Sequence, residues 1–312
     1  MKKYFTLMMA TFALFWLAAC SLESGSGSTN TAPAKASNAT AQTGEKTIGM
    51  SISTLNNPFF VTLSDSAKAK ASQTGAALTV VDAQNDASKQ AADVEDLIQQ
   101  GVKLIIINPV DSAAVVSAIE SANNAGIPVI TVDRSASGGN VFSHIASDNV
   151  AGGKLAGEYL LTLIPEGSEV AMLEGVAGSS AAIERGEGFT KAIEGKLNVV
   201  TSQTADFDRS KGLTVMENIL QAQPNVKAVF AQNDEMALGA LEAVNAAKKD
   251  VVVIGFDATT DAVAKVKEGK LAATVEQQPS LIGEEAINAA VRYFNGENVE
   301  KAIPVQLKLV TK

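Results

Sequence analysis

The feature that narrows the possible folds most is a regular alternation of short β-rich runs with longer alanine-rich segments. The first four runs predict strands over 47–53, 77–82, 104–108 and 128–133. The segments between them, 58–74, 88–100 and 112–125, have a helical pattern, and each is followed by a glycine. Glycine is favoured at that position because the residue after a helix often adopts the left-handed conformation. This order of elements is typical of parallel βαβ units.

The second half of the chain repeats this rhythm, with strands predicted over 169–173, 198–202, 226–232 and 251–257. In each half a Val-Lys pair leads a strand that ends in asparagine, at Asn108 and at Asn233. Asp133 follows the first asparagine by 25 residues, and Asp257 follows the second by 24. Asn and Asp also follow strands in other doubly wound proteins, but two similarly wound lobes best explain why the same residue types recur at matching positions in both halves. We therefore predict an α/β fold of two similar doubly wound parallel-sheet lobes joined by a hinge.

The N-terminus has the layout of an export signal. Lys2 and Lys3 precede an apolar run over 4–19 that is shorter than the ~20 residues needed to span a bilayer. The run ends in Leu-Ala-Ala-Cys, which resembles the lipobox of bacterial lipoproteins. We predict a signal peptide over 1–19 and lipidation of Cys20, which would anchor an extracytoplasmic protein to the membrane. A plain membrane anchor, or a secretory signal with an incidental cysteine, are the alternatives.

Residues 20–45 are mostly Ser, Gly, Thr, Ala and Asn, a composition that buries too little apolar surface to fold. We predict a lipidated flexible tether there. The folded body would comprise a first lobe of 46–147 with 278–306, and a second lobe of 148–277 with 307–312. Cys20 is the chain's single cysteine, so no disulfide can form within the chain and stability must come from burial.

The charge balance disfavours polyanionic partners. The full chain carries a net charge of −9, and removal of Lys2 and Lys3 with the signal peptide leaves −11. No basic stripe of the kind that neutralises phosphates is apparent, so we expect no nucleic-acid binding.

Several ordered motifs make the chain recognisable. They are Ser-Thr-Leu-Asn-Asn-Pro-Phe-Phe at 53–60, Thr-Val-Asp-Arg at 131–134, Ser-His-Ile-Ala-Ser-Asp-Asn at 143–149, Glu-Arg-Gly-Glu-Gly-Phe at 184–189, Ala-Asp-Phe-Asp-Arg at 205–209, Gln-Asn-Asp-Glu-Met-Ala-Leu-Gly at 232–239 and Leu-Ala-Ala-Thr at 271–274. Over essentially all of 46–312 the sequence resembles the periplasmic ribose-binding proteins, which are sugar-binding components of ABC importers in the periplasmic binding protein type 1 family.

The resemblance implies a pocket between the lobes. From the first lobe and the hinge-side elements it would take Ser53, Asn57, Phe59, Phe60, Asp133 and Arg134. From the second lobe it would take Arg185, Phe207, Asn233 and Asp257, with Gln277 at a crossover between lobes. The resemblance also implies that the permease of an ABC importer is the partner, with a chemoreceptor as a further candidate.

The residue types of this set suit a sugar. Carboxylates accept hydrogen bonds, guanidiniums donate them and amides do both, so together they can satisfy a ring of hydroxyls. Phenylalanine rings can cover the apolar faces of the ligand. The two negative charges of the acids equal the two positive charges of the arginines, so the set predicts an uncharged ligand. We expect ribose, with allose, xylose, galactose or a furanosyl signalling molecule as alternatives.

The sequence is poor in catalytic groups. His144 is the sole histidine, which excludes a histidine-dependent triad elsewhere, and no metal-ligand spacing is present. Gly152-Gly153-Lys154 resembles a phosphate loop only faintly and fits a helix start. Asp133 and Asp257 lie beside cationic or amide groups suited to keeping them ionised, which indicates binding rather than glycosidase chemistry.

We therefore predict a monomeric binding protein that is not an enzyme and uses no cofactor or metal. A sugar-responsive transcriptional regulator would share the two lobes, but the export signal and tether occupy the place of its DNA-binding helices. A secreted sugar-cleaving enzyme remains open, and incubation with labelled ribosides would reveal its turnover.

Overall fold

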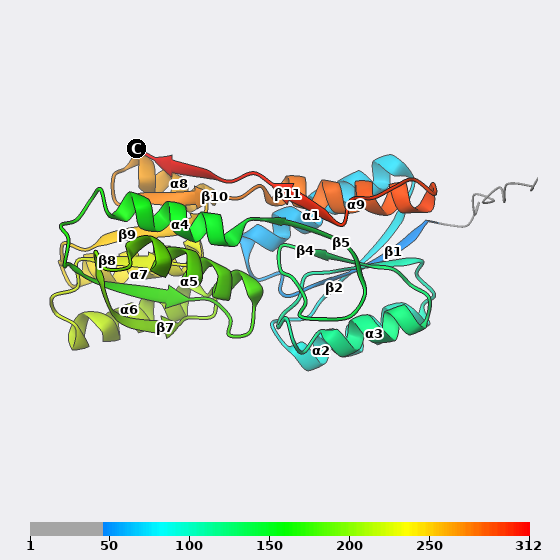
Figure 1. Cartoon of the computed structure of the whole chain (residues 1–312), viewed down its shortest axis with the longest axis horizontal. Coiled ribbons are helices and arrows are strands. Elements are labelled where there is room, and N and C mark those ends of the chain that lie inside the picture. Colours follow the sequence, from blue (N-terminus) through cyan, green and yellow to red (C-terminus); the bar gives the residue numbers. More distant parts are fainter. Residues whose placement is uncertain (1–45) are drawn as a thin grey trace, which may run out of the picture. The chain divides into compact units, whose positions relative to one another are not determined.

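A computed structural model describes residues 46–312 (Figure 1), and the predicted signal peptide, Cys20 and the whole of the predicted tether lie outside these residues. The described part forms two α/β lobes, each built on a six-stranded sheet. Its elements in chain order are β1 (Thr47–Ile52), α1 (Pro58–Thr74), β2 (Ala77–Asp82), α2 (Ala87–Gln99), β3 (Leu104–Ile107), α3 (Val116–Asn124), β4 (Val129–Val132), β5 (Val141–Ser147), α4 (Asn149–Leu160), β6 (Glu169–Glu174), α5 (Ser180–Ile193), β7 (Asn198–Thr204), α6 (Arg209–Ala222), β8 (Ala228–Ala231), α7 (Asp234–Ala246), β9 (Val252–Asp257), α8 (Thr260–Lys267), β10 (Ala273–Glu276), α9 (Pro279–Phe294), β11 (Ala302–Val305) and β12 (Lys308–Thr311).

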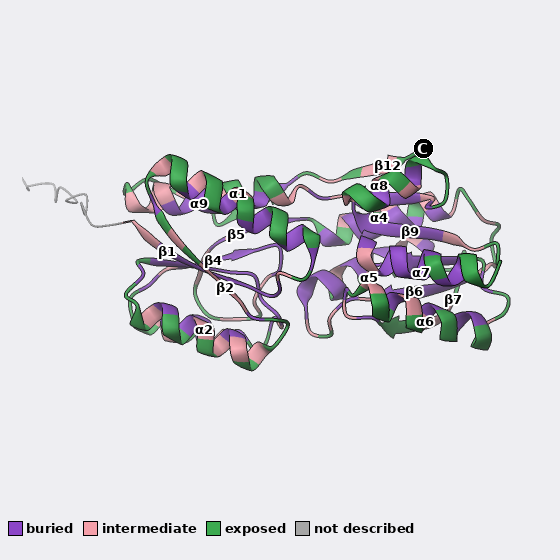
Figure 2. Ribbon diagram, turned by 180° about the vertical axis from the view of Figure 1, so that it is seen from behind, coloured by how far each residue is buried: buried purple, intermediate pink, exposed green. Residues whose placement is uncertain are grey.

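The sheet of the first lobe has the order β11-β5-β4-β3-β1-β2, and all its strands run parallel. α1 packs against α9 on one face, and α2 packs against α3 on the other. Successive residues of β3 point to opposite faces, so Leu104 and Ile106 join the α1 and α9 side while Ile105 and Ile107 join the α2 and α3 side. The helices accordingly bury their inner faces and expose their outer ones (Figure 2).

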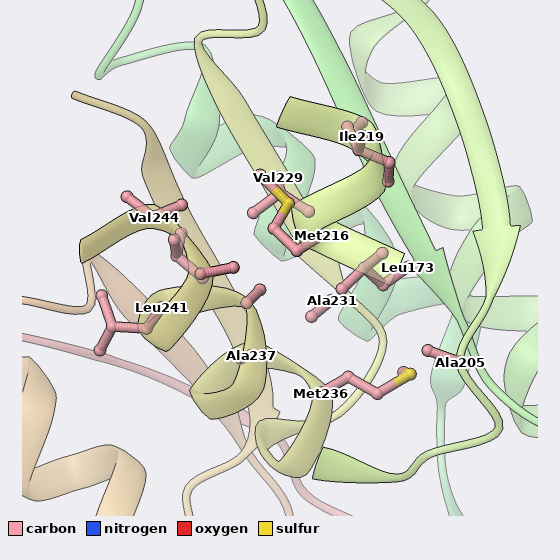
Figure 3. Packing of buried hydrophobic residues seen from close by; sticks show 14 of the residues in the cluster. Leu173, Ala205, Met216, Ile219, Val229, Ala231, Met236, Ala237, Leu241 and Val244 are labelled. Atoms are coloured by element: carbon pink, nitrogen blue, oxygen red, sulfur yellow. The ribbon is translucent and has the colours of Figure 1, made fainter. Parts of the chain in front are cut away.

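The sheet of the second lobe has the order β12-β10-β9-β8-β6-β7. α4 and α5 cover one face, and α6 and α7 cover the other. On the latter face Met216 and Ile219 of α6 pack with Met236 and Leu241 of α7 over the strands (Figure 3). The prediction of two parallel-sheet α/β lobes is confirmed.

One strand differs from a purely parallel sheet, because β12 pairs antiparallel with β10. The reason lies in the chain path. The strands of both lobes direct their carboxyl ends toward the space between the lobes, and the chain leaves β11 at such an end. After Gln306 and Leu307 it enters the second sheet at its carboxyl edge and has to run against its neighbours.

Most predicted elements lie within one or two residues of the observed ones, but the third predicted helix begins later than expected. The helical pattern started at residue 112, whereas α3 begins at Val116. The Asp111 carboxylate accepts hydrogen bonds from the backbone amides of Ala113 and Ala114, and the Ser112 hydroxyl donates to the carbonyl of Ser135 at 2.7 Å. These local bonds hold a turn in place of the first helical turn.

The weak phosphate-loop pattern at 152–154 has a packing role. Gly152 and Gly153 lie inside α4, and a Cβ at Gly153 would overlap the carbonyl oxygen of Arg185 in α5. A Cβ at Gly188 of α5 would likewise overlap the carbonyl oxygen of Val150. These glycines let the two helix backbones approach closely.

No helix among residues 46–312 is long and apolar enough to cross a membrane. The same residues contain no group of three or more His, Cys, Asp or Glu side chains placed to hold a metal ion.

Candidate functional site

A small cavity lies between the two lobes, at the carboxyl ends of their strands. Residues from both lobes form its wall: Asn57, Phe59, Phe60, Asp133, Arg134, Ala181, Arg185, Phe207, Asn233, Asp257 and Gln277. Ten of the eleven residues expected from the sequence therefore converge on one cavity. Its floor and sides combine two carboxyls, two guanidiniums, three amides and three aromatic rings.

The first segment of the wall is the junction of β1 with α1. The Asn57 side-chain oxygen Oδ1 caps α1 by accepting from the backbone amide of Phe59 at 2.9 Å, and Pro58 fits the first helical position. This cap uses the acceptor of Asn57 and leaves its NH₂ group as the donor for the cavity. The rings of Phe59 and Phe60 pack edge to face with centroids 5.2 Å apart, which fixes the orientation of both.

Asp133 and Arg134 follow β4. Asp133 has a positive φ of 61°, and the buried Asn108 amide donates to its Oδ2 at 3.3 Å. The Arg134 guanidinium donates to the carbonyl of Pro109 at 3.1 Å and lies 5.2 Å from the ring centroids of both Phe60 and Phe207. Burial lowers the pKa of Arg134 to about 10, with Asp133 opposing the shift, so the side chain stays charged near neutral pH.

Arg185 of α5 is the cation of the second lobe. Its Nε donates to Asn149 at 2.9 Å and its Nη1 donates to the carbonyl of Gln232 at 2.8 Å. Its guanidinium also stacks on Phe256, 3.9 Å from the ring centroid. Burial lowers the pKa of Arg185, and the neighbouring Asp257, 3.9 Å away, opposes this. These contacts hold the guanidinium in one orientation at the cavity wall.

Asp257, Asn233 and Gln277 complete the polar wall of the second lobe. Gln277 Nε2 donates to Asp257 Oδ1 at 2.9 Å. Asn233 caps α7 through its oxygen and donates through Nδ2 to the carbonyl of Phe207 at 3.2 Å. Burial raises the pKa of Asp257 well above its ordinary value, although Arg185 lowers it.

Three buried atoms of the wall have no hydrogen-bond partner among the described residues: Asp133 Oδ1, Arg134 Nε and Gln277 Oε1. Unpaired buried polar atoms are rare, since each costs about 1–3 kcal/mol when water cannot reach it. Residues that line one small cavity thus contain two acceptors and one donor without a hydrogen-bond partner, and a ligand that both donates and accepts would satisfy them.

Phe207 lies in the loop after β7, in a left-handed conformation with φ of 58°. Gly175 makes this position possible, because a Cβ there would overlap the Phe207 ring. Phe207 therefore projects from the second lobe onto Arg134 of the first, across the cavity.

The lining differs from the expected set at two residues. Ser53 is not among the lining residues; it is fully buried, and its backbone amide donates to Asn108 Oδ1 at 3.2 Å. Ala181 lines the cavity but was missed. A small apolar side chain carries no chemical signal in a sequence, and its position at the start of α5 is evident only from the fold.

Direct hydrogen bonds join the lobes beside the cavity, at a set of residues that we call the interlobe clasp: Ser112, Ser135, Gly178 and Ser180. The Ser112 amide donates to the Gly178 carbonyl at 3.0 Å, and the Ser180 amide donates to the Ser112 hydroxyl at 3.1 Å. The Ser135 amide donates to the Ser180 hydroxyl at 2.9 Å. The clasp residues do not line the cavity, so they join the lobes without using the groups that face it.

Comparisons with known proteins agree with this architecture. A family model described as a periplasmic binding protein domain matches residues 48–298. The ribose import binding protein of Bacillus subtilis is 54% identical over 312 residues, 100% of both chains. The ribose import binding protein of Escherichia coli is 55% identical over 268 residues, which cover 85% of this chain and 90% of that protein.

Among solved structures, the Caulobacter myo-inositol binding protein bound to myo-inositol has a TM-score of 0.83 and 35% identity, covering 86% of this chain and 94% of that chain. The family match, the identities and the shared two-lobed fold lead to one conclusion: this chain belongs to the periplasmic binding protein family.

Proposed function

We propose that this protein captures ribose outside the cytoplasm by closing its two lobes and delivers it to the membrane permease of an ABC importer. Like its relatives, it is a binding component of a transporter and not an enzyme. The observation that carries the proposal is that three residues lining the interlobe cavity have buried atoms without a hydrogen-bond partner among the described residues: Asp133 Oδ1, Arg134 Nε and Gln277 Oε1. The names of relatives at 54% and 55% identity select ribose among sugars.

The cavity matches the chemistry of a small sugar. Each sugar hydroxyl both donates and accepts, so it can donate to Asp133 Oδ1 or Gln277 Oε1 and accept from Arg134 Nε. Phe59, Phe60 and Phe207 line the same cavity and offer apolar surface to the C–H groups of the ring.

The charge of the site favours a neutral ligand. Arg134 and Arg185 face Asp133 and Asp257, and each cation lies within 4 Å of one carboxylate. Because both cations are already paired with carboxylates, an acidic or phosphorylated sugar would bring a buried negative charge that no additional cation of the wall compensates. An uncharged sugar avoids this cost.

Lobe closure links binding to delivery. Arg134 of the first lobe lies over Phe207 of the second, so residues on both sides of the cavity meet only when the lobes are together. A ligand that contacts both sides stabilises the closed form in proportion to its preference for that form. The chain passes between the lobes at Ser147–Asn149, Gln277–Gln278 and Gln306–Leu307, and these three segments would act as the hinge. The permease would then recognise the closed lobes.

The same proposal extends to export and anchoring. Residues 1–19 would be the signal peptide, Cys20 would carry the lipid, and 20–45 would tether a monomeric body of lobes 46–147 with 278–306 and 148–277 with 307–312. A chemoreceptor is a further candidate reader of the closed form. Cys20→Ala should abolish incorporation of a labelled fatty acid, and light scattering of the lipid-free protein should give the mass of a monomer.

The proposal is tested by calorimetric titration and thermal unfolding of the lipid-free protein with ribose, allose, xylose, galactose and myo-inositol. A ligand that binds only the folded state raises the melting temperature, and ribose should raise it most. Arg134→Ala and Asp257→Ala should remove the ribose-dependent shift, while Thr74→Val, at the far end of α1, should retain it. A larger shift with another sugar would reassign the ligand, and no shift with any of them would refute a monosaccharide site.

A further inference from the structure

Asp234 is a fully buried carboxyl that does not line the cavity, although its neighbour Asn233 does. It is the first residue of α7 and accepts hydrogen bonds from two elements that lie apart in sequence. Its Oδ2 accepts from the backbone amide of Thr259 at 2.7 Å and from the Thr259 hydroxyl at 3.1 Å. Its Oδ1 accepts from the Thr274 hydroxyl of β10 at 2.7 Å.

These bonds reach the turn that carries the cavity residue Asp257. Asp257 and Ala258 both have positive φ, at 120° and 56°, a region that non-glycine residues adopt only when surrounding structure holds them there. The Ala258 amide donates to the Thr274 hydroxyl at 3.1 Å, and that hydroxyl in turn donates to Asp234. The two amides that follow Asp257 thus bond either to Asp234 or to the hydroxyl that Asp234 orients.

A glycine in β9 makes space for the Asp234 carboxyl. A Cβ at position 255 would overlap Oδ1 of Asp234, so Gly255 in β9 admits the carboxyl between strand and helix. Burial raises the pKa of Asp234 to about 7, while the hydrogen bonds from Thr274 and Thr259 lower it. The donors therefore favour the ionised form, whose oxygens can only accept.

We propose that Asp234 is a positioning residue for sugar binding, which holds the strained Asp257–Ala258 turn through Thr259 and Thr274 and thereby directs the Asp257 carboxyl into the cavity. The inference rests on the proposed function, since it assigns a role in ligand binding to a residue that would not touch the ligand.

The other cavity carboxyl is held in a different way. Asp133 also has a positive φ, and Asn108, fully buried after β3, donates to the Val132 carbonyl at 3.1 Å and to Asp133 Oδ2 at 3.3 Å. Asn108 therefore bonds to the carboxylate itself, whereas Asp234 bonds to the residue after the Ala258 turn and to the hydroxyl that accepts from Ala258. The role of Asp234 rests on these contacts of the second lobe.

The test is a double-mutant cycle read by calorimetric titration with ribose on the lipid-free protein. Asp234→Ala should weaken ribose binding ~10-fold or more, because the turn loses three buried acceptor contacts, and Asp234→Asn should weaken it less because the amide keeps one acceptor oxygen. In an Asp257→Asn background, Asp234→Ala should add little, since the residue acts through Asp257. Thr74→Val, a matched threonine substitution in the first lobe, should leave affinity unchanged.

A second variant, Thr274→Val, and amide exchange by NMR test the role of Asp234 in holding the turn independently of ribose binding. Thr274→Val removes the hydroxyl that links Ala258 to Asp234, and amide exchange measured by NMR should become faster at Ala258 and Thr259 while the core of the first lobe keeps its protection. Wild-type affinity in folded Asp234→Ala, additive losses in the cycle, or unchanged exchange at Ala258 in Thr274→Val would each overturn the inference. If the wild-type protein itself bound no ribose, the proposed function would fail, and the exchange measurement would still judge whether Asp234 holds the turn.

Discussion

Removal of the Ser180 hydroxyl should lower the affinity for every ligand by one common factor. This hydroxyl accepts from the Ser135 amide at 2.9 Å across the interlobe clasp, and Ser180→Ala leaves that amide without a partner in the closed form. An unsatisfied, partly buried amide costs about 1–3 kcal/mol, whereas in the open form water can solvate it. At the lower end, which suits the half-buried Ser135, closure becomes less favourable by about 1 kcal/mol, or roughly fivefold.

The apparent dissociation constant varies inversely with the closed fraction where the closed form is the minor one, so it should rise by that same factor. Since Ser180 does not line the cavity, the factor should be equal for ribose and for any weaker sugar that binds. The assay is calorimetric titration with at least two sugars, with Ser210→Ala in the first turn of α6 as the control. The N-cap Ser179 stays in place, so α5 should remain folded. A factor that differs between sugars, or no change in affinity, would refute the role of the clasp in closure.

Three further outcomes follow from the structure. Burial lowers the pKa of His144 below 6.5, so NMR of this single histidine should show a titration below 6.5. The folded state then binds fewer protons, and the free energy of unfolding should fall as the pH drops through 6.5; titration at or above that value would contradict this. Arg185→Lys loses a fork that lysine cannot reproduce and should weaken ribose binding at least about tenfold by calorimetry, and equal affinity would remove Arg185 from the site. Gly188→Ala forces a Cβ onto the Val150 carbonyl and should lower the free energy of unfolding in urea by about 1–3 kcal/mol, whereas the exposed Glu187→Ala should not, and equal stability of the two would contradict a close α4–α5 contact.

Much of the architecture could be predicted because its signals are local. The β-rich runs and the glycines at 75, 101 and 126 mark strand and helix ends, and in a parallel sheet the residues that follow strands share one edge. This logic places Asp133 and Asp257 beside a common cleft. It does not place Ser53, which ends the predicted run 47–53 but is buried and absent from the cavity lining. Neighbouring residues at a strand end face different directions, and composition cannot tell which one faces the ligand.

The remaining misses depend on long-range geometry. Asn233 and Asp234 are adjacent and chemically similar, yet the first caps α7 at the cavity and the second bonds to β10 and to the turn after β9. The interlobe clasp arises from how the two lobes meet and leaves no periodic pattern in either half. The antiparallel direction of β12 follows from the opposed orientation of the two sheets, which no single segment encodes.

The position of β12 bears on how the protein can be handled in the laboratory. This last strand covers β10, whose sequence Ala-Thr-Val-Glu would otherwise form an unpaired edge. A truncation before residue 307 would cut one of the three links between the lobes and also expose backbone donors and acceptors that can recruit a strand from another molecule. Purification tags therefore belong beyond Lys312, as an extension of the strand, and trimming the C-terminus is a route to aggregation.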